Sequence, residues 1–181
     1  EWRELYAQTY VQPSSEDPEF NITGWGSSYT GEPIPAQEMH EWVDATVERI
    51  AARGPRRVLE IGCGTGLLLA RLAPACEAYR GTDFSPAVLE HTRRLIEART
   101  DLAHVELSQR LADDFAGIEP GSFDTVIINS VTQYLPGIEY LKAELDGAAR
   151  GLCPGGRIFI GAVRNLPLLK AFHAAVQCRR A

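Results

Sequence analysis

The strongest indication of the fold in this chain is the sequence Val58-Leu59-Glu60-Ile61-Gly62-Cys63-Gly64-Thr65-Gly66. It opens with a short leucine and β-branched run over Arg57–Ile61, which is typical of a buried strand. Three glycines at alternate positions follow, and glycine allows a tight turn and a close approach of a ligand to the backbone. A helix is predicted directly after them, over Gly66–Leu72. A strand, a glycine turn and a helix in this order predict the first unit of a doubly wound α/β domain.

Strands and helices continue to alternate along the rest of the chain. Further strands are expected over Ala78–Thr82, His104–Leu107, Asp124–Asn129 and Arg157–Val163. Further helices are expected over Pro86–Arg99, Gly137–Leu152 and Leu166–Gln177. The turn Pro154-Gly155-Gly156 should close the second of these helices. This alternation predicts an α/β fold, a doubly wound and mostly parallel sheet of about five strands.

A short helix, a long loop and a longer helix are expected before the glycine stretch. Residues 1–11 have the marks of a short helix, and residues 12–34 are rich in Pro, Ser, Gly and aromatics. A loop this long is often a lid over a binding site, and an arm that only wraps the core is the alternative. Residues 35–53 have the apolar spacing of an amphipathic helix. We therefore divide the chain into an N-terminal lid over residues 1–34 and a core over residues 35–181.

The bulk composition limits the class of protein. With 181 residues, 45% of them hydrophobic and 23% charged, the chain fits one globular domain. The net charge of −6 and the lack of a Lys/Arg stripe argue against nucleic acid as a partner. No apolar run approaches the ~20 residues of a membrane span, and no signal-peptide pattern is present. The four cysteines form no Cys-x-x-Cys pair, so we expect reduced thiols in a cytoplasmic protein, no metal site and no membrane partner.

An acid before the glycines separates two kinds of cofactor. Glu60 stands two residues before Gly62, and the third glycine comes one residue earlier than in the dinucleotide pattern G-x-G-x-x-G. A carboxylate there would repel a pyrophosphate and would favour a ligand with a cationic amino group and a sulfonium. The stretch therefore points to S-adenosylmethionine (SAM) rather than to NAD. The residues of the glycine loop expected to bind this cofactor are Glu60, Gly62, Cys63, Gly64 and Gly66.

The second expected strand ends in the stretch Gly81-Thr82-Asp83-Phe84-Ser85. Asp83 lies 21 positions after Gly62, where an acid can accept hydrogen bonds from ribose hydroxyls. Capping of the helix that begins at Pro86 is the alternative role for this carboxylate. Ser85 is the better candidate for the cap, which leaves Asp83, with Phe84 beside it, to the ribose.

Two further groups follow the fourth and third expected strands. The backbone carbonyls of Asn129 and Ser130 can hold the methionine amino group beside the glycine loop. Gln133 and Tyr134, one turn on, would face the transferring methyl; a solvated turn residue and a core aromatic are the alternative.

After the third strand, the backbone of Ala112 and the side chain of Asp113 can meet an adenine edge. Capping of a short turn is the competing role for these residues.

Together these stretches resemble a known family. VLEIGCGTG, GTDFS, FDTVIINSVTQYL and LCPGGRIFIG, in this order and spacing over roughly residues 56–163, resemble class I SAM-dependent methyltransferases. The lead-in FNITGWGSSYTGEPIPAQEMHEWVDATVERI and the later VRNLPLLKAFHAAVQ are similar to methyltransferase domains embedded in nonribosomal peptide synthetases and hybrid polyketide synthetases. This second resemblance spans nearly the whole chain.

The resemblance implies a substrate and partners. The domain would methylate an aminoacyl or peptidyl intermediate tethered to a carrier protein through a phosphopantetheine thioester, most commonly on nitrogen. Adenylation and carrier domains would be its neighbours, SAM its cofactor and S-adenosylhomocysteine (SAH) its product.

The resemblance also implies roles for single residues. Glu60 and the glycines would hold the methionine end, and Asp83 would hold the ribose. Asn129 and Ser130 would flank the sulfonium. Tyr29 would close over the cofactor as part of the lid.

The sequence departs from the family in two ways. Leu111 stands where family members often have an acid before the adenine. The family normally has seven strands and this sequence supplies five, so we expect strands six and seven to be absent and the fifth to be an exposed apolar edge. We therefore expect the sequence to be a fragment of a longer domain.

The acceptor atom decides whether a base is needed. An amine acceptor needs only a free lone pair, whereas a hydroxyl or an acidic carbon needs a base close by. His173, on an apolar helix expected to pack on the sheet, is the main candidate, and a partly buried core histidine is the alternative. His40 is the second candidate. O- or C-methylation is favoured if His173 is catalytic, and N-methylation otherwise.

Two other classes stay open on the sequence. One is a nucleotide-linked oxidoreductase, which Glu60 and the glycine spacing argue against. The other is a SAM-binding domain without catalytic activity.

Overall fold

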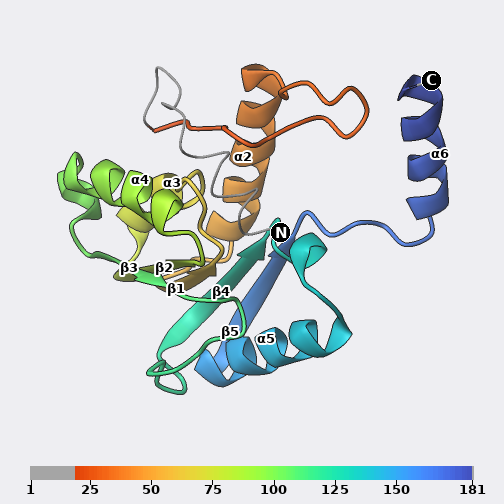
Figure 1. The fold of residues 1–181 in the computed structure, drawn as a ribbon. Coiled ribbons are helices and arrows are strands. Elements are labelled where there is room, and N and C mark those ends of the chain that lie inside the picture. Colours follow the sequence, from red (N-terminus) through yellow and green to blue (C-terminus); the bar gives the residue numbers. More distant parts are fainter. Residues whose placement is uncertain (1–18, 181) are drawn as a thin grey trace.

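The computed structural model describes residues 19–180 of the chain. They fold around five parallel strands in the order β3-β2-β1-β4-β5 (Figure 1). The strands are β1 (Arg57–Ile61), β2 (Ala78–Asp83), β3 (Val105–Gln109), β4 (Phe123–Asn129) and β5 (Leu152–Gly161). Strands are added to one side of β1 and then to the other, so the predicted doubly wound parallel sheet is confirmed.

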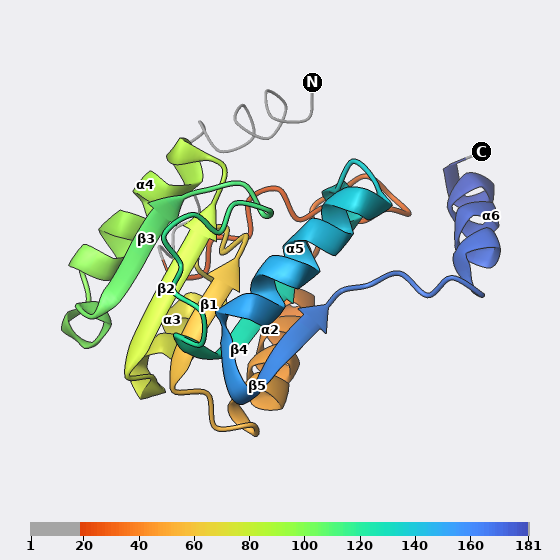
Figure 2. The same cartoon turned by 90° about the horizontal axis from the view of Figure 1, so that it is seen from below.

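Helices cover both faces of this sheet. They are α2 (Ala36–Ala51), α3 (Leu69–Leu72), α4 (Pro86–Glu97) and α5 (Ile138–Gly151), and a further helix, α6 (Leu169–Arg180), follows β5. The short 3-10 turns are η1 (Ala73–Ala75), η2 (Thr100–Leu102) and η3 (Thr132–Tyr134). α2 and α3 share a core with Val58 and Ile127 on one face. α5 packs on the other face, against Leu59 and Val126, as Figure 2 shows from below. Because neighbouring strand residues point to opposite faces, the apolar strands supply both cores.

Two helix starts show how local residues set the boundaries. α4 begins after Ser85, whose hydroxyl accepts a hydrogen bond from the Val88 amide at 3.4 Å, so the predicted cap is confirmed. α3 begins at Leu69, three residues later than predicted. Gly66 has a φ angle of 86°, far from the helical range, so it ends the glycine turn rather than beginning the helix.

β5 is longer than the sequence pattern predicts. It begins at Leu152, which pairs with Phe123, and the next paired residues are Arg157 and Thr125. A register irregularity therefore absorbs residues 153–156, which include the Pro-Gly-Gly turn predicted to close the preceding helix. The Pro-Gly-Gly sequence predicts a break at this position, but the strand pairing around it depends on β4 and is not a local property.

α6 stands apart from the sheet in both views (Figures 1 and 2). The prediction that this helix packs on the sheet is wrong, because apolar periodicity identifies a face but not the surface that the face meets. The connection from β5 leaves Leu166 80% exposed and Leu168 61% exposed. α6 instead contacts the lead-in segment, here residues 19–35 before α2, where the ring centroids of Phe172 and Tyr29 are 5.6 Å apart. Between residues 19 and 180, no helix combines the length and the apolar character needed to cross a bilayer.

The lead-in segment before α2 has two parts, one that packs on the core and one that forms a small hairpin. Phe20 and Asn21 are buried, and the Asn21 carbonyl accepts a hydrogen bond of 2.6 Å from the Thr65 hydroxyl in the glycine loop. Farther along, a single bridge between Gly26 and Pro33 closes a small hairpin. The helix expected over residues 1–11 lies outside the described residues. The lead-in therefore wraps the core at its start and reaches the ends of the strands farther on.

Candidate active site

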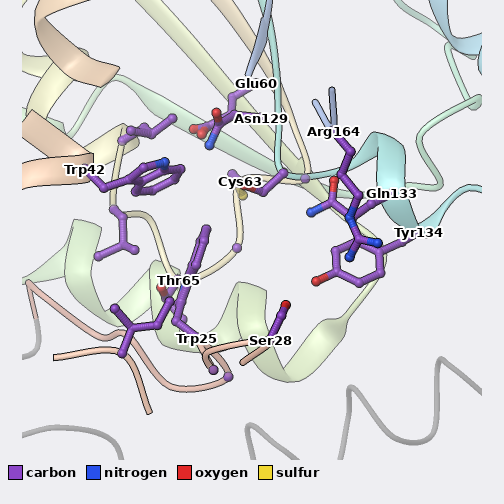
Figure 3. Close-up of a pocket in the computed structure, with 18 residues that line it drawn as sticks. Trp25, Ser28, Trp42, Glu60, Cys63, Thr65, Asn129, Gln133, Tyr134 and Arg164 are labelled. Atoms are coloured by element: carbon purple, nitrogen blue, oxygen red, sulfur yellow. The ribbon is translucent and has the colours of Figure 1, made fainter. Parts of the chain in front are cut away.

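A cavity of about 500 Å³ opens at the carboxyl ends of β1 and β4, between α2 and the lead-in hairpin (Figure 3). Glycine-loop residues, residues that follow β4 and residues of the lead-in surround it. Its lining is Gly24, Trp25, Gly26, Ser28, Ile34, Trp42, Glu60, Gly62, Cys63, Gly64, Thr65, Leu67, Leu68, Asn129, Ser130, Gln133, Tyr134 and Arg164. This is the edge of the sheet where ligands bind in doubly wound folds.

The three loop glycines are required for different reasons. All have positive φ angles, of 71° for Gly62, 54° for Gly64 and 86° for Gly66. A Cβ at Gly62 would lie 2.5 Å from a Val131 methyl, and one at Gly66 would lie 3.2 Å from Thr92, so packing excludes side chains there. A Cβ at Gly64 would meet no protein atom within 4 Å, and this residue lines the cavity. Gly64 therefore leaves bare backbone facing the space where a ligand would lie.

Glu60 is a buried carboxyl in the cavity wall, only 3% exposed. The Tyr79 hydroxyl donates a hydrogen bond of 2.8 Å to its Oε2. Burial raises the pKa of Glu60 from 4.5 to about 8; the Tyr79 hydrogen bond opposes this, and the nearby Asp83 charge adds to it. A cationic ligand group would restore the ionised form, so this carboxyl is suited to binding an ammonium.

Asp83 lies beside the cavity but does not line it. Its two carboxylate oxygens accept hydrogen bonds from the Gly64 amide (3.1 Å) and the Ser85 amide (2.9 Å). Burial raises its pKa, and these backbone hydrogen bonds oppose the rise. Asp83 thus ties the end of β2 to the glycine loop, and its role toward a ribose stays a prediction. Phe84 next to it is half-buried.

The residues after β4 reach the cavity as the sequence places them. Asn129, Ser130, Gln133 and Tyr134 all line it. Ser130 has a φ angle of 58°, an uncommon conformation for a residue with a side chain, and its buried Oγ has no hydrogen-bond partner among the described residues. Tyr134 is 53% exposed, so it is not the core aromatic of the alternative interpretation. The methyl-facing role of Gln133 and Tyr134 stays a prediction.

Besides Gly66, Asp83 and Phe84, four more expected site residues do not line the cavity. Ala112 packs against the core on the α5 face, and Asp113 is exposed and interacts with Tyr140. Tyr29 is 40% exposed at the tip of the hairpin. His173 is exposed on α6 and does not line the cavity; the alternative of a partly buried core histidine is not met either.

His40, the second candidate base, is exposed on α2 and stacks on Phe20, with ring centroids 3.6 Å apart.

Several lining residues are not among the site residues that the sequence predicts, and Trp25, Trp42 and Arg164 are three of them. Trp42 falls within the amphipathic pattern of residues 35–53 and Trp25 within the aromatic-rich loop of residues 12–34, and neither pattern points to a cavity. Arg164 follows β5, and the rule that ligands bind at the carboxyl ends of strands could have found it. Figure 3 shows Arg164 beside Gln133 and Tyr134, across the cavity from Trp42.

The comparisons with known proteins agree with this geometry. Residues 59–158, more than half of the chain, match the family model described as "Methyltransferase domain". The chain belongs to this family. The methyltransferase domain is 53% identical over 181 residues to chondramide synthase cmdD of Chondromyces crocatus, covering 99% of this chain and 5% of that protein. It is 44% identical over 177 residues to the probable non-canonical nonribosomal peptide synthetase CymA of Salinispora arenicola (strain CNS-205), covering 98% of this chain and 2% of that protein.

Solved structures confirm the fold of the methyltransferase domain. The N-methyltransferase NodS from Bradyrhizobium japonicum WM9, in complex with SAH, superposes with a TM-score of 0.67 at 16% identity. The match covers 98% of this chain and 84% of NodS. The domain therefore has the Rossmann-like fold of class I methyltransferases and resembles the domains found within nonribosomal peptide synthetases.

Proposed function

We propose that this domain transfers the methyl group of SAM to the amino nitrogen of an aminoacyl or peptidyl intermediate tethered to a carrier protein. One observation carries the proposal. A single cavity joins the glycine loop and Glu60 to the residues after β4, so that a cofactor and an acceptor can meet in it. The methyltransferase family of the chain supplies the reaction class.

The cavity residues fit SAM. Gly64 leaves its backbone open to the cavity, and the buried Glu60 carboxyl matches the cofactor's ammonium. SAM supplies a methyl group already activated on a positively charged sulfur. Glu60, Asn129 and the glycine loop would hold its methionine end, and Asp83 its ribose. The protein's main task is then to align the acceptor with the methyl. Gln133 and Tyr134 line the cavity, and they would face the methyl.

The lining of the cavity favours nitrogen as the acceptor. Among the described residues that line it, none is a histidine, and the ionisable ones are Glu60, Cys63, Tyr134 and Arg164. Burial raises the pKa of the Cys63 thiol well above its usual value, so the thiolate is disfavoured. Glu60 is committed to the cofactor. A neutral amine needs no base to attack, whereas a hydroxyl or an acidic carbon does.

The relatives support a tethered acceptor. The chain spans 5% and 2% of the two relatives' lengths, and the second of these proteins is named as a nonribosomal peptide synthetase. We therefore place the domain in such an assembly, with carrier and adenylation domains as neighbours.

The test uses this chain, SAM and a carrier domain loaded with an aminoacyl phosphopantetheine thioester. We expect mass spectrometry to show the gain of one methyl on the aminoacyl group, and fragmentation to place it on nitrogen. The matched control is Gly64→Val, which should abolish the gain. Methylation on oxygen or carbon would contradict the choice of acceptor, and SAM binding without any transfer would identify a non-catalytic domain.

A further inference from the structure

Two indole side chains form one side of the cavity. Trp25 comes from the lead-in segment and Trp42 from the middle of α2, and both line the cavity together with Glu60 and Cys63. Their ring centroids lie 4.7 Å apart with an interplanar angle of 51°. Figure 3 shows both rings beside the glycine loop, with Arg164 on the far side. We call Trp25 and Trp42 the indole wall.

The backbone of each tryptophan is fixed. The Trp25 amide donates to the Ile22 carbonyl at 3.1 Å, and its carbonyl accepts from the Ile34 amide at 3.0 Å. Trp42 lies on α2 next to Val43, which is completely buried. Both rings are themselves partly buried against the core. The indole wall therefore exists before a ligand enters, and little conformational entropy is lost when a ligand contacts it.

The charges around the cavity are unevenly distributed. The face of an indole carries partial negative charge and attracts a cation within about 6 Å of the ring, most strongly when water is excluded. Glu60, which lines the same cavity, adds a buried carboxyl. Arg164 is the one Lys or Arg side chain among the described lining residues, and it lies across from Trp42 (Figure 3). A ligand with a positive centre is therefore favoured on the side of the indole wall.

We propose that the indole wall binds the sulfonium of SAM through the faces of Trp25 and Trp42, and so distinguishes SAM from the uncharged SAH. This inference rests on the proposed function. The two ligands differ only by the methyl group and the charge on sulfur. An aromatic wall that stabilises this charge favours SAM over SAH when the two compete for the site, because the uncharged product lacks the attraction.

A simple apolar contact would behave differently. Burial of the same ligand surface against leucine or tryptophan would change the affinities for SAM and for SAH by similar factors. Only an interaction with the positive charge changes the ratio of the two affinities. This ratio, rather than either affinity alone, is the decisive measurement.

The test measures dissociation constants of SAM and SAH by calorimetry for the wild type, Trp25→Leu and Trp42→Leu. We expect each leucine variant to lose about 2- to 30-fold of affinity for SAM relative to SAH, the range of one cation–π contact. Trp25→Phe and Trp42→Phe are the matched controls and should keep part of the preference. Circular dichroism melting confirms that each variant is folded. If Trp42→Leu unfolds, Trp25→Leu decides, because its ring belongs to the lead-in and not to a helix.

The outcomes separate this inference from the proposed function. Equal loss of both affinities in the leucine variants would overturn the sulfonium contact and leave the proposed function standing. An unchanged ratio together with a raised KM for the acceptor would overturn it as well and assign the wall to the acceptor. Failure of the wild type to bind either ligand would contradict the proposed function itself.

Discussion

Replacing Glu60 by glutamine should remove a large pH dependence from the stability of the empty protein. In the folded chain burial raises the pKa of Glu60 from 4.5 to about 8. The unfolded chain ionises this group near 4.5, so between these values the folded state holds a proton that the unfolded state has lost. The group's contribution to stability is therefore complete below about pH 4.5 and is lost as the pH rises to about 8.

The magnitude follows from the shift. Each unit of difference between the folded and unfolded pKa of Glu60 corresponds to about 1.4 kcal/mol. The free energy of unfolding should therefore fall by about 1.4 kcal/mol per pH unit between the two pKa values, and by about 5 kcal/mol in total. Glutamine cannot ionise, and its carbonyl can still accept the Tyr79 hydroxyl. The difference in the free energy of unfolding between the wild type and Glu60→Gln should therefore show this slope, because the contributions of the other titrating groups cancel.

Urea denaturation of both proteins across this pH range measures the effect. Tyr79→Phe is a useful companion, because it removes the hydrogen bond that opposes the rise and should extend the wild-type slope to higher pH. SAM binding should release close to one proton near neutral pH in the wild type and none in Glu60→Gln, as calorimetry in two buffers would show. Parallel stability curves for the wild type and Glu60→Gln would show that burial does not raise the pKa of Glu60.

Three further substitutions test single features. Gly64→Val should abolish SAM binding, because its φ angle of 54° and the open space in front of it direct a side chain into the cavity; a normal dissociation constant for the folded variant would contradict this. Asp83→Ala should weaken SAM binding by about 1–3 kcal/mol and lower the melting temperature, because the Gly64 and Ser85 amides lose their acceptors. If calorimetry gives an unchanged affinity and the melting temperature also stays the same, Asp83 does not belong to the site. Glu144→Met should stabilise the protein by about 1–3 kcal/mol above pH 7, because the carboxyl is fully buried and neither of its oxygens has a described hydrogen-bond partner, and burial raises its pKa to about 7. A melting temperature of Glu144→Met below that of the wild type at high pH would argue against this.

Local sequence patterns are enough to predict the separate structural units of this protein. The change from a short apolar run to alternate glycines predicts β1, its turn and the helix that follows, since glycine alone tolerates positive φ angles at three positions so close together. Ser85 before Pro86 predicts the start of α4. Glu60 and Asn129 could be assigned to a site because each stands at the end of a strand, and in a parallel sheet those ends meet at one edge.

Which of these groups share a cavity depends on how the elements pack against one another. Trp25 and Trp42 meet because the lead-in packs beside the middle of α2, a contact that neither segment encodes alone. Asp83 is committed to the Gly64 amide because β1 and β2 are neighbours in register. α6 leaves the sheet although its apolar spacing suggested otherwise. Periodicity and spacing describe one element at a time, whereas a site depends on distances between elements, and the order of the strands sets those distances.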